Sequence, residues 1–299
     1  MKKLLVFFLL LQLVACQKTE EITEDKLNIV ATTTMLQDMV WQIAGEQVNL
    51  TGLCAVGVDP HSYVPTYEDC QALLHADVVL YHGHFLEGQM GELFTTLEEE
   101  GVTVLSLEQG IPMEYLLFEE ETGFVDPHLW WDTQLWKLSA FYVAESLCHV
   151  DEENAIFYQE NLAIFTEQLD ELEREIVRKV AEISEEQRVL ITAHDAFGYY
   201  GKAYGFTVMG IQGINTETEA GTGDISALAH YIAENQIKCI FTETSVSDKS
   251  IKALEEAVAA KGFQVKISSD SLFSDSLGGG MNYIETAKAN LSHIVKGLI

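Results

Sequence analysis

The stretch RVLITAHDAFGYYGKAYG (188–205) combines a strand, a turn and a helix, and it guides the interpretation of the whole chain. Its first residues form a short, β-branched apolar run, which is typical of a strand buried on both faces of a parallel sheet. The run ends at Thr192, Ala193 and His194, and a helical stretch follows as far as Gly205. The pattern therefore predicts a strand that presents an imidazole at its carboxyl end.

The same plan occurs near the start of the chain, at LNIVATTTMLQDMVWQIAG (27–45). Further apolar runs follow in each half: VNLTGL, ADVVLYHG and GVTVLSL in the first, and FTVMGI, IKCIFTET and FQVKISS in the second. Strands that alternate with helix-length segments indicate the α/β class. We expect two similar lobes, each with a parallel sheet covered by helices.

The segment between the two halves, 151–184, contains neither Gly nor Pro. Its apolar residues recur at near-helical spacing from Ile156 to Val180, which predicts one long, rigid helix joining the lobes. Ligands of α/β sheets bind beyond the carboxyl ends of the strands, so we expect a ligand cleft between the lobes. The predicted organisation is a lipoprotein signal peptide at 1–15, a tether at 16–26, an N-terminal α/β lobe at 27–150, the linking helix at 151–184 and a C-terminal α/β lobe at 185–299.

The charge of the chain restricts its partners. The 299 residues carry a formal net charge of −30, with 47% hydrophobic residues. Such a surface repels nucleic acid and attracts cations into its clefts. We therefore expect no nucleic-acid partner.

The N-terminus is typical of an exported protein. Met1, Lys2 and Lys3 precede the apolar run LLVFFLLLQLVAC, which is too short to span a membrane as a mature helix. Its end, Leu13–Cys16, resembles a bacterial lipobox, which implies cleavage before Cys16 and acylation of its thiol. The alternative is an ordinary signal peptide with a chance cysteine. We expect an extracytoplasmic, lipid-anchored protein.

The remaining cysteines are expected to be free thiols, with a Cys54–Cys70 disulfide as the alternative.

Three histidines and one aspartate follow predicted strands. His61 and His128 each end a Val-Asp-Pro-His sequence before a helical segment, and His194 ends the first strand of the second half. Asp275 follows the last strand, before a Gly-rich loop. Each histidine taken alone is better explained as a hydrogen-bonded loop residue. Together, three imidazoles and a carboxylate suit a divalent transition metal held in the cleft, with two ligands from each lobe.

Several motifs make a family resemblance specific. The sequence resembles the TroA-like metal-binding lipoproteins, the solute-binding components of zinc and manganese ABC importers, over the chain from about Leu27 to its end. The resemblance rests on VDPHSYVPT, DVVLYHGHFLE, VDPHLWWD, ITAHDAFGYYGKAYGF, GIQGINTETEAG, IFTETSV and FSDSLG. It implies a cleft metal bound by His61, His128, His194 and Asp275, two lobes on one rigid helix, and a permease and an ATPase as partners. We expect a monomer that binds metal without turnover.

The identity of the ion stays open between Zn²⁺ and Mn²⁺. The third imidazole, His194, favours Zn²⁺, because some manganese-binding members have Glu there and Zn²⁺ binds most N/O sites more tightly. The segment AHDAFGYYGKAYGF, however, also resembles members linked to manganese. A His-rich loop found in some members is replaced here by the short, acidic PMEYLLFEEETGFVD.

Two other classes of function are weighed against this one. A zinc hydrolase would need an open metal position, which Asp275 is expected to fill, and no H-E-x-x-H sequence occurs. A surface adhesin is compatible with the membrane tether, but no motif specifies one.

For other polar residues near the predicted strand ends, the sequence is consistent with more than one role. His82 and His84 are either partners of the site, an auxiliary metal site or a polar loop tip. Asp195 either orients His194 or starts a helix. The same two roles are open for Glu243, which ends a strand facing the cleft. Trp130 and Trp131 are expected to pack between the lobes. The remaining histidines, His75, His149, His230 and His293, are expected to lie on helices away from the metal.

Overall fold

The computed structural model describes residues 26–119, 122–218 and 220–299. The predicted signal peptide and Cys16 lie outside these residues. No helix within the described ranges has both the length and the apolar character needed to cross a membrane.

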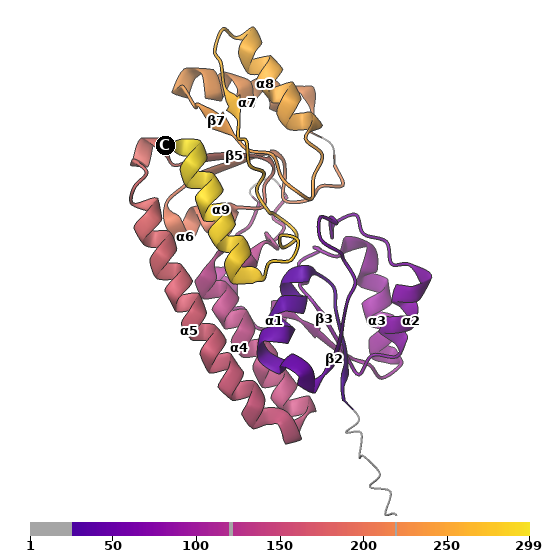
Figure 1. Ribbon diagram of the computed structural model, residues 1–299. Helices are drawn as coiled ribbons and strands as arrows, with labels where there is room; N and C mark the ends of the chain where they lie inside the picture. Colours follow the sequence, from indigo (N-terminus) through magenta and orange to yellow (C-terminus); the bar gives the residue numbers. More distant parts are fainter. Residues whose placement is uncertain (1–25, 120–121, 219) are drawn as a thin grey trace, which may run out of the picture.

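The first lobe is built on a four-stranded parallel sheet with the order β2-β1-β3-β4. Helix α1 covers one face, and α2 and α3 cover the other (Figure 1). Side chains alternate between the faces, so that Val30 and Val79 pack toward α2 and α3 while Ile29 and Leu80 pack toward α1. The elements are β1 (Asn28–Ala31), α1 (Thr34–Ala44), β2 (Asn49–Gly52), α2 (Tyr67–Leu74), β3 (Val78–Tyr81), α3 (Gly91–Glu99) and β4 (Thr103–Ser106).

The second lobe repeats this plan with two longer strands, β5 and β6, and two shorter ones, β7 and β8. Its strands form two parallel pairs, β5-β6 and β7-β8, and the hydrogen bond from Phe241 N to Ile191 O joins the chain after β7 to β5. The order β6-β5-β7-β8 is thus the same as the order β2-β1-β3-β4 of the first lobe, which agrees with the similar plan of the two halves of the sequence. The elements are β5 (Val189–His194), α6 (Gly198–Tyr204), β6 (Thr207–Gln212), α7 (Thr222–Asn235), β7 (Cys239–Ile240), α8 (Lys249–Ala260), β8 (Lys266–Ile267) and α9 (Tyr283–Leu298).

Strand β5 is buried along its whole length because two separate cores meet on it. Ile191 and Ala193 pack into the core beneath α7 and α8, whereas Leu190 joins the core shared with α5 and α9. The strand ends at His194, between the two lobes. This confirms the prediction that a strand buried on both faces delivers an imidazole at its end.

The linking helix α5 (Ala155–Val180) is 26 residues long and begins four residues later than predicted. Asp151 ends the preceding helix α4 (Thr133–Val150) and caps a short 3₁₀ turn, so the chain changes direction before α5 starts. Figure 1 shows α5 running from the side of α1 to the second lobe, where α9 lies beside it. Ile156, which the sequence pattern placed in the buried stripe, is exposed, and Tyr158 is buried instead.

The cysteines of the described residues are free, as expected: Cys54, Cys70, Cys148 and Cys239. The alternative Cys54–Cys70 disulfide is not formed.

Candidate metal centre

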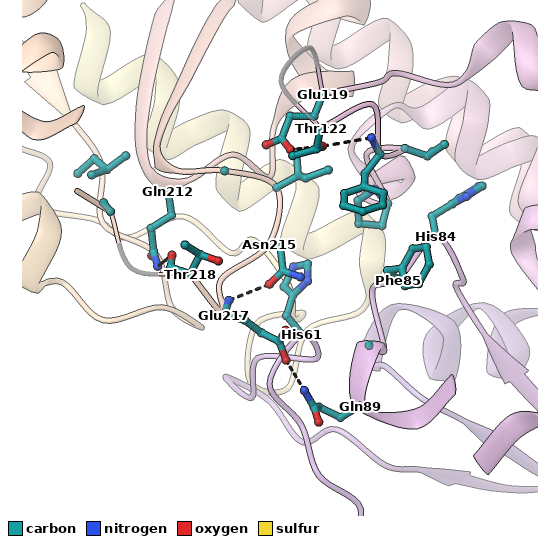
Figure 2. A pocket seen from close by; sticks show the side chains of 18 of the residues that line it. His61, His84, Phe85, Gln89, Glu119, Thr122, Gln212, Asn215, Glu217 and Thr218 are labelled. Atoms are coloured by element: carbon teal, nitrogen blue, oxygen red, sulfur yellow. Dashed lines mark hydrogen bonds between the residues drawn. The ribbon is translucent and has the colours of Figure 1, made fainter. Parts of the chain in front are cut away.

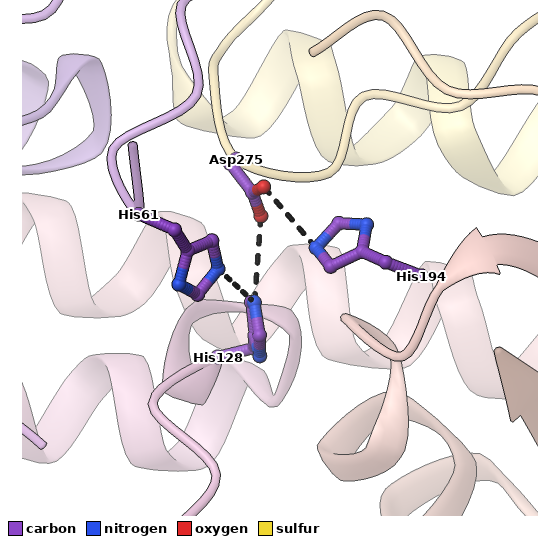
Figure 3. Close-up of side chains that lie close together, drawn as sticks. All are labelled: His61, His128, His194 and Asp275. Carbon is purple, nitrogen blue, oxygen red and sulfur yellow. Dashed lines mark hydrogen bonds and ion pairs between the residues drawn. The ribbon is translucent and has the colours of Figure 1, made fainter. Parts of the chain in front are cut away.

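The structure brings the four predicted ligands together from loops that are far apart in the sequence. His61 lies between β2 and α2, His128 precedes α4, His194 ends β5, and Asp275 lies between β8 and α9. One potential donor atom from each lies within 4.8 Å of the others. Figure 3 shows the three imidazoles and the carboxylate pointing toward a common centre.

The distances in this cluster suit a small four-coordinate ion. His61 Nε2 and His128 Nε2 are 3.3 Å apart, His128 Nε2 and Asp275 Oδ1 are 3.5 Å apart, and His194 Nε2 and Asp275 Oδ2 are 3.1 Å apart. For metal–donor distances of about 2.0–2.2 Å, tetrahedral geometry places neighbouring donors about 3.3–3.6 Å apart. The first two pairs have this spacing, and the third pair, at 3.1 Å, is slightly closer.

The carboxylate of Asp275 is a buried charge whose close polar contacts are imidazoles. Both oxygens are buried; Oδ2 forms an ion pair with His194 Nε2, and Oδ1 faces His128 Nε2. Burial alone would raise the pKa of Asp275, but the nearby imidazoles of His194, His128 and His61 lower it below its usual range. A buried carboxylate that stays ionised needs a cation, and the histidine Nε2 atoms around it are suited to share one.

The two Val-Asp-Pro-His sequences share one local hydrogen bond. In each, the aspartate accepts a hydrogen bond from the backbone nitrogen of the histidine two residues later: Asp59 Oδ1 from His61 at 2.9 Å, and Asp126 Oδ1 from His128 at 2.9 Å. The proline between them fixes the backbone of the turn. The spacing of Asp and His was the available signal for this role, and sequence reasoning used only the histidine.

Carboxylates also orient two of the three rings. Asp126 Oδ1 accepts from His128 Nδ1 at 2.7 Å, and Glu243 Oε2 forms an ion pair with His194 Nδ1 at 2.5 Å. Each ring then presents its Nε2 lone pair to the centre when it binds an ion. Of the two roles left open for Glu243, the structure supports that of a partner of His194. For Asp195, the side-chain oxygen Oδ1 is buried without a hydrogen-bond partner among the described residues, and α6 begins three residues later, at Gly198.

The protonation of His61 and His194 differs because their surroundings differ. Burial lowers the pKa of His61 to about 3, so this ring is neutral at neutral pH. Burial also disfavours the charged form of His194, but the carboxylates of Asp275 and Glu243 outweigh it and raise the pKa well above its usual value. The proton on His194 is therefore the one that an incoming cation must displace.

The loop that carries Asp275 is held by the first lobe, although it follows the last strand of the second. Trp130 Nε1 and Trp131 Nε1 both donate to the carbonyl oxygen of Ser274, at 2.9 and 3.2 Å. Leu277 N donates to Thr34 Oγ1 at 2.8 Å. The expectation that the two tryptophans pack between the lobes is thus met, and they also position Asp275.

A cavity of about 560 Å³ between the lobes leads to the cluster, and His61 is the one predicted ligand that borders it. Figure 2 shows His61 at the base, with Gln89 and Glu217 meeting across the gap. Glu119, Glu217 and Asp224 also line the cavity. Their negative charge favours the entry of cations.

His82 and His84 lie outside the cluster. The buried ring of His82 contacts Thr33 Oγ1 at 2.9 Å and packs against Trp130, while His84 lies beside Glu108. Neither joins the group of potential metal ligands found among the described residues. His75 and His293 hydrogen-bond to backbone carbonyls, which agrees with their expected structural roles.

Comparison with known proteins places this arrangement in context. Residues 29–297 match the family described as zinc-uptake complex component A, periplasmic. The zinc-binding protein TroA of Treponema pallidum is 40% identical over 279 residues, covering 92% of this chain and 90% of that protein. The solved structure of TroA superposes with a TM-score of 0.88 over 91% of this chain and 99% of that one. The manganese ABC transporter substrate-binding lipoprotein PsaA of Streptococcus anginosus is 33% identical over 309 residues, covering 100% of this chain and 99% of that protein.

Proposed function

The chain belongs to the family of periplasmic zinc-uptake component A proteins, and we propose on this basis that it captures Zn²⁺ or Mn²⁺ outside the cytoplasm and delivers the ion to an ABC importer. The ion is cargo, bound and released without chemical change. The observation that carries the proposal is the buried Asp275 carboxylate, which is surrounded by three imidazoles whose donor atoms lie within 4.8 Å of it and of one another.

The proposed ligands are His61, His128 and His194 through Nε2, and Asp275 through its carboxylate. The orientation of the rings by Asp126 and Glu243 supports this assignment, since such partners fix the tautomer that binds metal. Three nitrogen donors favour Zn²⁺ over Mn²⁺ in the intrinsic order of affinity. The physiological ion also depends on which metal is available outside the cell.

A binding protein explains the site better than an enzyme does. Four protein donors complete a tetrahedral shell, so no position remains at which a metal-bound water could be activated. The relatives are named as metal-binding and transporter components. The zinc hydrolase and the adhesin are therefore not favoured.

We assign the remaining features by the same reasoning. The N-terminal lobe at 27–150, the linking segment at 151–184 that contains α5, and the C-terminal lobe at 185–299 form the metal-binding body, which acts as a monomer. Cleavage before Cys16 and acylation of its thiol tether this body to the outer face of a bacterial membrane. The name of the streptococcal relative as a lipoprotein of an ABC transporter supports both the anchor and a permease with its ATPase as partners.

Metal analysis tests the proposal. Protein purified without added ions is analysed by mass spectrometry for bound metal, and cells lacking the gene are assayed for uptake of radioactive zinc and manganese. We expect close to one ion per chain and a loss of uptake that the wild-type gene restores. Protein that binds neither ion in competition titrations, or a deletion without any uptake defect, contradicts the function.

A further inference from the structure

The three histidines of the metal centre are not held equally. His128 and His194 each have a carboxylate beside Nδ1, at 2.7 and 2.5 Å. His61 Nδ1 is buried and has no hydrogen-bond partner among the described residues. The ring of His61 therefore depends on the position of its backbone more than the other two rings do.

The backbone of His61 is positioned by Asp59, and Asp59 is tied to the opposite lobe. Asp59 Oδ1 accepts from His61 N at 2.9 Å. Asp59 Oδ2 accepts from Thr216 Oγ1 at 2.6 Å, across a sequence separation of 157 residues. Thr216 lies in the loop between β6 and α7, so this hydrogen bond joins the second lobe to the turn that carries His61.

A neighbouring contact crosses the same gap. Gln89 Nε2 donates to Glu217 Oε1, the side chain next to Thr216 in the sequence. The Gln89–Glu217 contact lies at the cavity that leads to His61 (Figure 2). Because the partners in this contact and in the Asp59–Thr216 hydrogen bond belong to different lobes, both are lost when the lobes separate.

We propose that the Asp59–Thr216 hydrogen bond is an interlobe latch that keeps His61 in place around the ion and limits the rate of ion release. This inference rests on the proposed function. A hydroxyl bound to an ionised carboxylate makes a stronger hydrogen bond than one between neutral groups. The bond exists only while the lobes are together, so it stabilises the closed form and slows the opening through which the ion leaves.

The two Val-Asp-Pro-His turns thus differ in one respect. Both aspartates accept from the backbone of their histidine, but Asp126 also accepts from its ring. Asp59 instead uses its second oxygen for Ser62 in its own lobe, at 3.1 Å, and for Thr216 in the other. Asp59 and Thr216 are therefore positioning residues for His61.

The test measures dissociation of Zn²⁺ by stopped flow with an excess of chelator. Thr216→Val removes the hydroxyl and keeps the shape of the side chain, and we expect release about tenfold faster, which corresponds to about 1.4 kcal/mol. Thr216→Ser retains a hydroxyl and should restore the wild-type rate. Thr218 lies in the same loop, and among the described residues its side chain makes no hydrogen bond to Asp59, so Thr218→Val should release at the wild-type rate.

A second pair of measurements separates a latch from local support of Asp59. Ser62→Ala removes the donor to Asp59 from the same lobe and should change release less than twofold. In metal-free protein, amide hydrogen exchange in loop 213–218 should rise in Thr216→Val and stay unchanged in Ser62→Ala. Equal acceleration by Ser62→Ala and Thr216→Val, or a wild-type rate in Thr216→Val, overturns the latch. Failure of wild-type protein to bind Zn²⁺ or Mn²⁺ instead overturns the proposed function.

Discussion

The indole nitrogen of Trp130 lies 2.9 Å from the carbonyl oxygen of Ser274, 144 residues away in the sequence. Ser274 precedes Asp275, so a side chain of the first lobe fixes the only carboxylate among the four predicted ligands. Trp131 donates to the same oxygen. The metal centre therefore depends on contacts that hold its loops as well as on its ligands.

Trp130→Phe should weaken metal binding without unfolding the protein. The ring is kept, but the hydrogen bond that positions Asp275 is lost, and changes of this kind typically cost about 10–100-fold in affinity. We expect the lower end of that range because Trp131 still donates to Ser274. Trp136→Phe is the matched control. Trp136 is also fully buried, but its indole nitrogen has no hydrogen-bond partner among the described residues. Calorimetric titration that gives both variants the same affinity contradicts this role.

Metal affinity should fall as the pH is lowered, starting above neutrality. The raised pKa of His194 means that this ring is protonated in the metal-free protein at neutral pH, so binding must displace its proton. His61, with a pKa of about 3, contributes no proton in this range. We expect affinity to drop about tenfold for each pH unit below neutrality, as the release of one proton requires.

Calorimetry in buffers of different ionisation enthalpy counts the released protons directly. The count should be close to one at neutral pH. A pH-independent affinity between pH 5 and 8, or no proton release, is incompatible with ligation by His194.

Binding of metal should stabilise the folded protein, since the ion binds the folded form in preference to the unfolded one. A free concentration of 100 times Kd adds about 2.7 kcal/mol. For a protein of this size we expect an increase in Tm of about 5–10 °C. The metal-free Tm of His128→Ala should stay near that of the wild type, while added metal should raise it much less. Scanning calorimetry with and without Zn²⁺ makes the comparison, and an equal increase in both proteins argues against a role for His128.

Cys16→Ser should release the protein from the membrane or leave it unprocessed, because the serine hydroxyl is not the thiol that is acylated. Fractionation of cells and labelling with a fatty-acid analogue provide the measurement. A variant that remains membrane-bound and is processed like the wild type shows that Cys16 is not the anchor.

The sequence was informative where its signals are local. The apolar run before His194 and the two Val-Asp-Pro-His sequences are short patterns. The two-lobe α/β fold could be predicted from the repeated strand and helix patterns, and the set of four ligands from the His and Asp positions together with the family resemblance. The start of α5 was misplaced because Asp151 caps a turn inside a stretch that has helical periodicity. Contacts such as Asp59–Thr216 and Trp130–Ser274 join residues that no local pattern relates, so they required the structure.

The most direct test of the central claim is a calorimetric titration with Zn²⁺ and Mn²⁺ of wild-type protein and six alanine variants. Four of them remove a proposed ligand: His61→Ala, His128→Ala, His194→Ala and Asp275→Ala. Two controls, His75→Ala and His293→Ala, remove histidines that bind backbone carbonyls instead. We predict that each ligand variant loses more than about 100-fold in affinity, beyond the usual effect of a change in a residue that only supports a ligand, while both controls bind like the wild type. Wild-type affinity in His194→Ala would contradict the account.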